Sequence, residues 1–179
     1  MRKFISAWLI FVCSCTIPSK KEERIITFSE VMKLDIGKSS EAEVIATFGM
    51  PNDRIDDSDY FTLEYTDPKT GFLLLSVNFF REPRLVQAFL WIPRQEDKEF
   101  GLEGAKAVYG AAQFKLFRDE PASHSVSETY SLIDDQAGVT IRFNGIRNTV
   151  EAIARFEGGS RKPSSGHKEV TSQSSRRNN

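Results

Sequence analysis

Apolar and polar residues alternate with the period of a β-strand through the first half of the chain. Tyr60–Tyr65 places Phe61, Leu63 and Tyr65 on one face. Further strands are expected at Arg54–Ile55, Phe72–Phe80 and Leu85–Ile92. Short segments with turn residues, such as Asp67–Gly71, separate these strands. The pattern predicts antiparallel strands that follow one another in a meander.

A short helix is predicted before these strands. Ser40 lies three residues before Glu43, which is the spacing of a capping box. Gly49 follows Phe48, and glycine commonly ends helices because it enters the left-handed conformation without strain. The second half has the same order: a helix is expected at Leu102–Tyr109, followed by strands at Gln113–Phe117, Thr129–Ile133, Val139–Phe143 and Val150–Phe156.

The two halves also match each other in detail. Leu75–Phe79 aligns with Val139–Phe143, and Val86–Phe89 aligns at the same offset with Val150–Ile153. We therefore predict an α+β fold of two tandem helix-plus-four-strand units, in which an antiparallel sheet carries the helices packed on one face. The units are expected to cover residues 28–96 and 97–157.

The N-terminal segment has the layout of an export signal. Arg2 and Lys3 precede an apolar run that is too short to span a bilayer as a helix, and small residues lead up to Cys15. The sequence Val12–Cys15 resembles the lipobox of bacterial lipoproteins. That resemblance implies removal of residues 1–14 and acylation of Cys15 by diacylglycerol and palmitate, which would anchor the protein stably. A soluble secreted protein cut near the same place is the alternative.

The residue after Cys15 and the polar segments at both ends of the chain predict the membrane location and the flexible parts of the protein. In many lipoproteins an Asp directly after the cysteine retains the protein in the inner membrane, and this chain has Thr16 there. The resemblance therefore implies the periplasmic face of the outer membrane. Residues 15–27 would be the lipidated cysteine and a polar tether. Residues 158–179 hold five Lys or Arg against one Glu and few apolar residues, so we expect a disordered basic tail.

One motif suggests a family. Ile36–Gly37, the pair Ser39–Ser40, Val44 and Phe48–Pro51 resemble the opening of the SmpA/OmlA (BamE-like) outer-membrane lipoproteins. Phe48 stands where that family has Leu, and the spacing from Gly37 to Val44 is one residue longer. The doubled unit is similar to the tandem β-lactamase-inhibitor-protein (BLIP-like) fold.

These resemblances imply a non-enzymatic periplasmic module that binds protein and assists assembly or stability of an outer-membrane protein complex. The alternative is an inhibitor-like or peptidoglycan-associated envelope lipoprotein. The expected partners are the membrane, through Cys15, an outer-membrane or periplasmic protein, and in the alternative peptidoglycan, but not nucleic acid.

No residue pattern indicates chemistry. Asp53, Asp56, Asp57 and Asp59 crowd one loop, but their spacing lacks the glycine turn and distal Glu of a calcium-binding loop. His124 and His167 have no further ligand at metal spacing, and the serines beside His124 do not form a triad pattern. We therefore predict no catalytic residue, no metal and no cofactor.

The remaining candidates are aromatic. Phe80, Phe89 and Trp91, together with Phe72 and Leu74, provide more bulk than one core-facing stripe of a strand requires. They either fill the core under the helices or form an exposed patch where a protein partner binds, because aromatic residues dominate interface hot spots.

Overall fold

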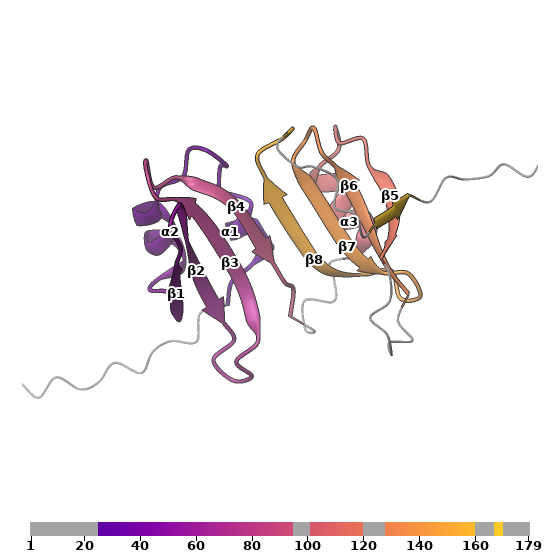
Figure 1. Cartoon of the computed structure of the whole chain (residues 1–179). Helices are drawn as coiled ribbons and strands as arrows, with labels where there is room; N and C mark the ends of the chain where they lie inside the picture. The colour runs from indigo at the N-terminus through magenta and orange to yellow at the C-terminus, as the bar shows by residue number, and fades with distance from the viewer. Residues whose placement is uncertain (1–24, 95–100, 120–127, 160–166, 170–179) are drawn as a thin grey trace, which may run out of the picture.

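The structure is a computed structural model that describes residues 25–94, 101–119, 128–159 and 167–169. Within these ranges the chain forms three short helices and nine strands (Figure 1). The helices are α1 (Phe28–Val31), α2 (Glu41–Phe48) and α3 (Leu102–Val108). The strands are β1 (Asp53–Asp56), β2 (Tyr60–Thr66), β3 (Leu73–Phe80), β4 (Val86–Trp91), β5 (Lys115–Asp119), β6 (Thr129–Asp134), β7 (Val139–Asn144), β8 (Thr149–Phe156) and β9 (His167–Glu169).

Local signals place these elements. The capping box that begins α2 is present: the Ser40 hydroxyl accepts from the Glu43 N–H at 3.3 Å, and the Glu43 carboxylate accepts from the Ser40 N–H at 2.7 Å. Gly49 ends the helix with φ of 81°. The expected elements β1 to β8, α2 and α3 lie within two residues of their predicted ends. Helix α1 was not predicted, although Thr27 and Glu30 form a second capping box.

The prediction of two helix-plus-four-strand units is wrong. All described strands belong to one sheet in the order β1-β2-β3-β4-β8-β7-β6-β5-β9. The two halves join at a seam where β4 pairs with β8, from Ala88 opposite Phe156 to Trp91 opposite Ile153. A β4 that ended the first unit would expose a row of unpaired N–H and C=O groups, and pairing with β8 satisfies them.

A single hydrophobic core lies on one face of this sheet. Its buried side chains come from all three helices and from strands on both sides of the seam. Val44 of α2, Ala105 of α3 and Ile153 of β8 are all 0% exposed. The core therefore extends through both halves of the chain, and the three short helices pack on the core face of one continuous sheet.

A short strand forms near the C-terminus of the chain. Within the segment expected to be a disordered tail, His167–Glu169 forms β9, which pairs antiparallel with β5. An edge strand offers free backbone groups to any extended segment, so a polar sequence can add to it without a hydrophobic face. Cys15 and the other residues of the predicted signal and tether up to residue 24 lie outside the described residues.

Candidate functional site

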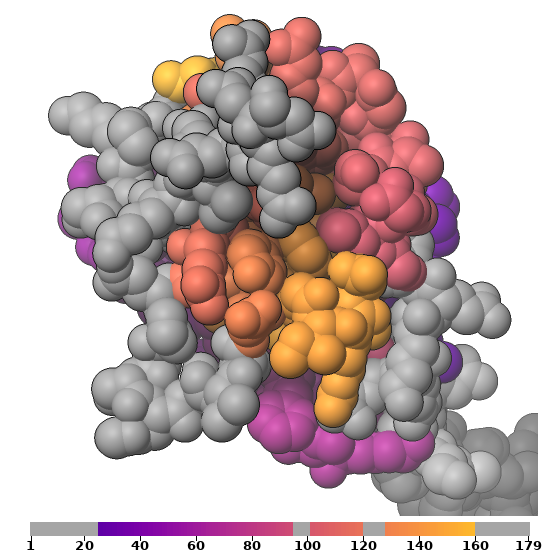
Figure 2. All heavy atoms as spheres, turned by 90° about the vertical axis from the view of Figure 1, so that its right-hand side faces the viewer, coloured from indigo at the N-terminus to yellow at the C-terminus, as the bar shows by residue number. Residues whose placement is uncertain are grey.

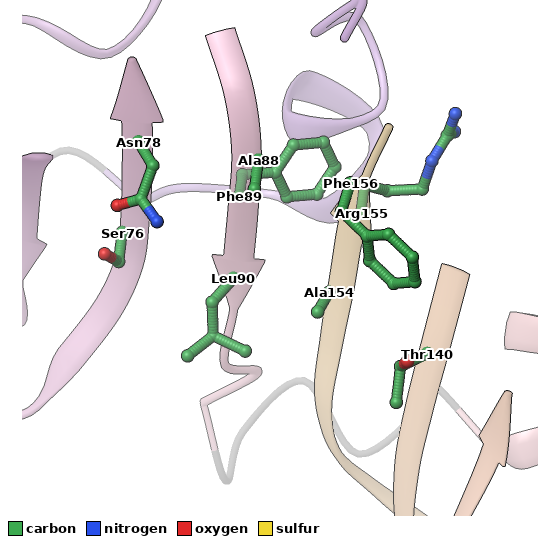
Figure 3. A pocket seen from close by; sticks show the side chains of 9 residues that line it. All are labelled: Ser76, Asn78, Ala88, Phe89, Leu90, Thr140, Ala154, Arg155 and Phe156. Carbon is green, nitrogen blue, oxygen red and sulfur yellow. The ribbon is translucent and has the colours of Figure 1, made fainter. Parts of the chain in front are cut away.

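A hollow of about 440 Å³ lies on the sheet face opposite the core, across the seam between β4 and β8 (Figure 3). Strands β3, β4, β8 and β7 form its floor, and none of its lining residues belongs to a described helix. Its lining residues are Ser76, Asn78, Ala88, Phe89, Leu90, Thr140, Ala154, Arg155 and Phe156.

The strand registers explain why the surface is hollow there. Residues paired across a sheet share a face, so Ser76, Leu90, Ala154 and Thr140 form one row across the four strands. The neighbouring row contains Asn78, Ala88 and Phe156. Most side chains in these two rows are small, and the large ones are Leu90 and Phe156, which form the sides of the hollow.

A hydrogen bond fixes the orientation of a polar side chain at one side of the hollow. The Thr62 hydroxyl donates to the Asn78 side-chain oxygen at 2.7 Å, which fixes the orientation of that amide. Figure 3 shows the Asn78 nitrogen turned toward β4. The hollow therefore combines an apolar floor with amide and hydroxyl groups at its edge, a combination suited to a peptide segment that carries an apolar side chain.

Two lining residues have side chains on the core face of the sheet. Phe89 and Arg155 are directly paired, and Phe89 is 2% exposed. The Arg155 guanidinium carbon lies 5.6 Å from the centre of the Tyr109 ring. Burial raises the pKa of Tyr109 to about 12, while Arg155 opposes that rise. Tyr109 thus stays neutral, and its hydroxyl donates to the Met32 sulfur at 3.2 Å. The contacts of Tyr109 with Arg155 and Met32 therefore stabilise the core side of the seam.

The aromatic candidates do not form one exposed patch. Phe89 and Trp91 are 2% and 1% exposed and belong to the core, where Trp91 packs on Phe28 with ring centres 5.0 Å apart. Phe80 pairs with Tyr60 on the opposite face and is half-buried. Of the two roles predicted for these aromatics, Phe89 and Trp91 have the core role.

The acidic loop near β1 is held by arginines. Asp56 accepts from Arg54 at 3.0 Å and forms an ion pair with Arg81 at 3.6 Å. Among the described residues no group of three or more His, Cys, Asp or Glu side chains could hold a metal ion. His124 lies outside the described residues, and His167 lies in β9.

The hollow was missed at the level of sequence because it is made by small residues. Ala88 and Ala154 are 66 positions apart in the chain and become diagonal neighbours only through the pairing of β4 with β8. Small residues at the alternate strand positions that face away from the core can indicate such a surface. They identify a hollow only once the strand order shows which of them are neighbours.

The chain matches no family model, no curated protein and no solved structure. The resemblance to SmpA/OmlA lipoproteins therefore remains a prediction from the motif around Gly37 and Gly49. In the part of the chain that the structure describes, no helix has both the length and the apolar character needed to cross a membrane.

Proposed function

We propose that this protein is a lipid-anchored envelope module that binds a protein partner through the hollow at the β4–β8 seam and so assists assembly or stability of an outer-membrane protein complex. The observation that carries the proposal is the hollow itself. It lies on the face that the helices leave uncovered, and its floor consists of small side chains. Binding is the function best supported by a site with an apolar floor, polar edge groups and no nucleophile–base pair.

The shape favours a protein segment over a small soluble ligand. The hollow has lining residues from both sides of the seam, so an extended segment can lie across it while one apolar side chain enters between Leu90 and Phe156. Burial of one large apolar side chain contributes roughly 1.5–3 kcal/mol. Asn78 and Ser76 can hydrogen-bond to the segment's backbone, which would fix its direction.

The anchor supports the assignment to the envelope. Acylated Cys15 would hold the module at the membrane, where its partners are confined to the same surface. The lipobox resemblance of Val12–Cys15 and Thr16 after the cysteine support the outer membrane. Mass spectrometry of the mature N-terminus should find the acyl chains, and an unmodified Cys15 would reject this part of the proposal.

Site-specific crosslinking tests the binding face. A photoreactive amino acid at Ala154 should crosslink to a protein of the outer membrane in intact cells, identified by mass spectrometry. The control carries the same group at Val108, which is 47% exposed at the end of α3 on the helix side of the sheet. Equal products from both positions would refute the assigned face, and recovery of only a cell-wall enzyme or peptidoglycan would refute the assembly role.

A further inference from the structure

The most exposed large apolar side chains gather at one end of the sheet. Phe72, Met50 and Ile146 are 74%, 72% and 71% exposed. Phe72 lies in the turn between β2 and β3, Met50 lies just before β1, and Ile146 lies in the turn between β7 and β8. Most of the surface of each residue is therefore in contact with solvent.

The strand directions place all three at the same end. Each neighbouring pair in the series β2, β3, β4, β8 and β7 is antiparallel, so β2, β4 and β7 run the same way. The turns that follow β2 and β7 therefore point in one direction, as Figure 1 shows at the lower side of the sheet. Strand β1 runs opposite to β2, so Met50 also lies there. The turns are separated by about three strand spacings, or roughly 14 Å.

Both turns are braced and both carry a cation. An Asp67 side-chain oxygen accepts from the N–H groups of Lys69 and Thr70 at 2.8 and 3.2 Å. An Asn144 side-chain oxygen accepts from the N–H groups of Ile146 and Arg147 at 3.1 and 3.0 Å. Lys69 and Arg147 are exposed beside the apolar residues. Asp67 also forms an ion pair with Arg94 at 3.2 Å, and the positive charge of Lys69 helps to lower the pKa of Asp67.

The opposite end of the sheet differs in character. Its turns are residues 57–59, 81–84 and 135–138, which contain charged, polar and small residues and no large apolar one. Among the described residues, the three most exposed large apolar residues thus lie at the other end, while Ile55 and Tyr60 near this end are 48% and 42% exposed. Figure 2 shows the β2–β3 tip, in magenta, as a protruding lower edge.

The N-terminal chain also enters the body near this end. Strand β4 runs toward it, and its last residue, Trp91, packs on Phe28 of α1. Only residues 16–24 separate Cys15 from the first described residue, Ile25. Ten extended residue steps from Cys15 to Ile25 reach about 36 Å at most, so an anchor at Cys15 keeps the start of the body within that distance of the bilayer.

We propose that this end of the sheet, here called the membrane-facing end and defined by Met50, Phe72 and Ile146, rests on the bilayer that holds the anchor. Phe72 and Ile146 enter the head-group region, and Lys69 and Arg147 contact lipid phosphates. Apolar side chains beside cations are the pattern of surfaces that lie at a membrane interface. The inference rests on the proposed lipid anchor, and it leaves the hollow on the sheet face accessible to a partner.

Tryptophan quenching by brominated lipid tests this orientation. The mature lipidated protein, with its acylation verified by mass, is reconstituted in vesicles of phosphatidylethanolamine and phosphatidylglycerol. Phe72→Trp should be quenched strongly, whereas Tyr60→Trp, an aromatic exchange at the opposite end, should not. Trp91 is a constant background in both variants because it is 1% exposed.

Each outcome separates this inference from the proposed function. Lipidated protein with equal or absent quenching at the two positions would overturn the membrane-facing end and leave the anchor standing. A protein without acyl chains would overturn the anchor and the inference together. Lipidated protein quenched only at position 72 supports both.

Binding of the unlipidated protein provides an independent measurement. In the mature chain with Cys15→Ser, the double variant Phe72→Ser and Ile146→Ser should weaken binding to these vesicles by about tenfold or more, since 1.4 kcal/mol is a factor of ten. Lys69→Gln should weaken it about fivefold in low salt, because a cation near an anionic surface contributes about 1 kcal/mol. Unchanged binding in both variants would overturn the inference.

Discussion

Ile153→Ala tests whether the two halves share one core. Ile153 is 0% exposed in β8, where it pairs with Trp91 of β4 on one side and Ile141 of β7 on the other. Removal of a buried isoleucine side chain to alanine costs about 2–5 kcal/mol, because transfer free energy is lost and a cavity remains. Proteins of this size have stabilities of about 5–15 kcal/mol, so the change is a large part of the whole.

The assay is urea unfolding followed by two probes. Far-ultraviolet circular dichroism reports the whole sheet, while fluorescence reports Trp91 in the first half of the chain. With a slope of about 2 kcal/mol per M, the unfolding midpoint should fall by about 1–2.5 M in both signals. The matched control is Ile146→Ala, the same deletion at a position 71% exposed, which should change stability by less than about 0.5 kcal/mol.

The result that would refute one continuous core is a split response. If Ile153→Ala shifted the circular dichroism transition but left the Trp91 transition in place, the halves would unfold separately. Coincident shifts in both probes are expected from a sheet in which β4 and β8 pair along the seam.

Three further predictions address local features. Gly138→Ala should destabilise the protein strongly, because φ at this position is +64° and the added Cβ would meet the Phe156 carbonyl oxygen at 2.1 Å. Thermal unfolding measures this effect, and an unchanged melting temperature would contradict the prediction. Backbone N–H groups, chiefly that of Ala137, lower the pKa of Asp134, so its stabilisation is present above the unfolded pKa of about 3.8 and is lost as pH falls through the lower folded value. Asp134→Asn should therefore reduce the acid dependence of the unfolding free energy, and an unaltered dependence would count against the assignment. Ser40→Ala should lower the free energy of unfolding by about 1 kcal/mol, because the N-cap of α2 is lost. Urea unfolding measures the change, and the control is Ser29→Ala, which alters an exposed serine in α1.

Much of the local structure follows from short-range signals. The Ser40 and Glu43 capping box, the glycine after Phe48 and the period-two strands each act within a few residues, and the structure has them where they were expected. The aligned segments even share a local irregularity: the pairing shifts register between Asn78 and Phe79 and again between Arg142 and Phe143.

The arrangement of the halves could not be predicted in the same way. Whether β4 is an edge or pairs with β8 depends on residues more than sixty positions apart, and nothing in the pattern of either strand records its partner. Repetition in the sequence suggested two units, but unsatisfied strand edges favour one sheet. The same pairing creates the hollow, which explains why none of its small residues was a candidate.

The aromatic residues show a related limit of pattern reasoning. Phe89 and Leu90 are adjacent and both apolar, yet Phe89 faces the core and Leu90 faces the hollow. Alternation assigns residues to two faces but does not state which face the helices cover. The helices cover the face of Phe89 and Trp91, and the uncovered face carries the proposed site.

The most direct test of the proposed function compares two alanines of β8. Ala154 and Ala152 share the outward face of one strand, but only Ala154 lines the hollow. Once crosslinking has identified the partner, its affinity is measured for Ala154→Phe and Ala152→Phe, with circular dichroism as a check of folding. Ala154→Phe should fill the hollow and abolish binding, while Ala152→Phe should bind as the unaltered protein does. Equal affinity of both variants, each folded, would contradict binding at the seam.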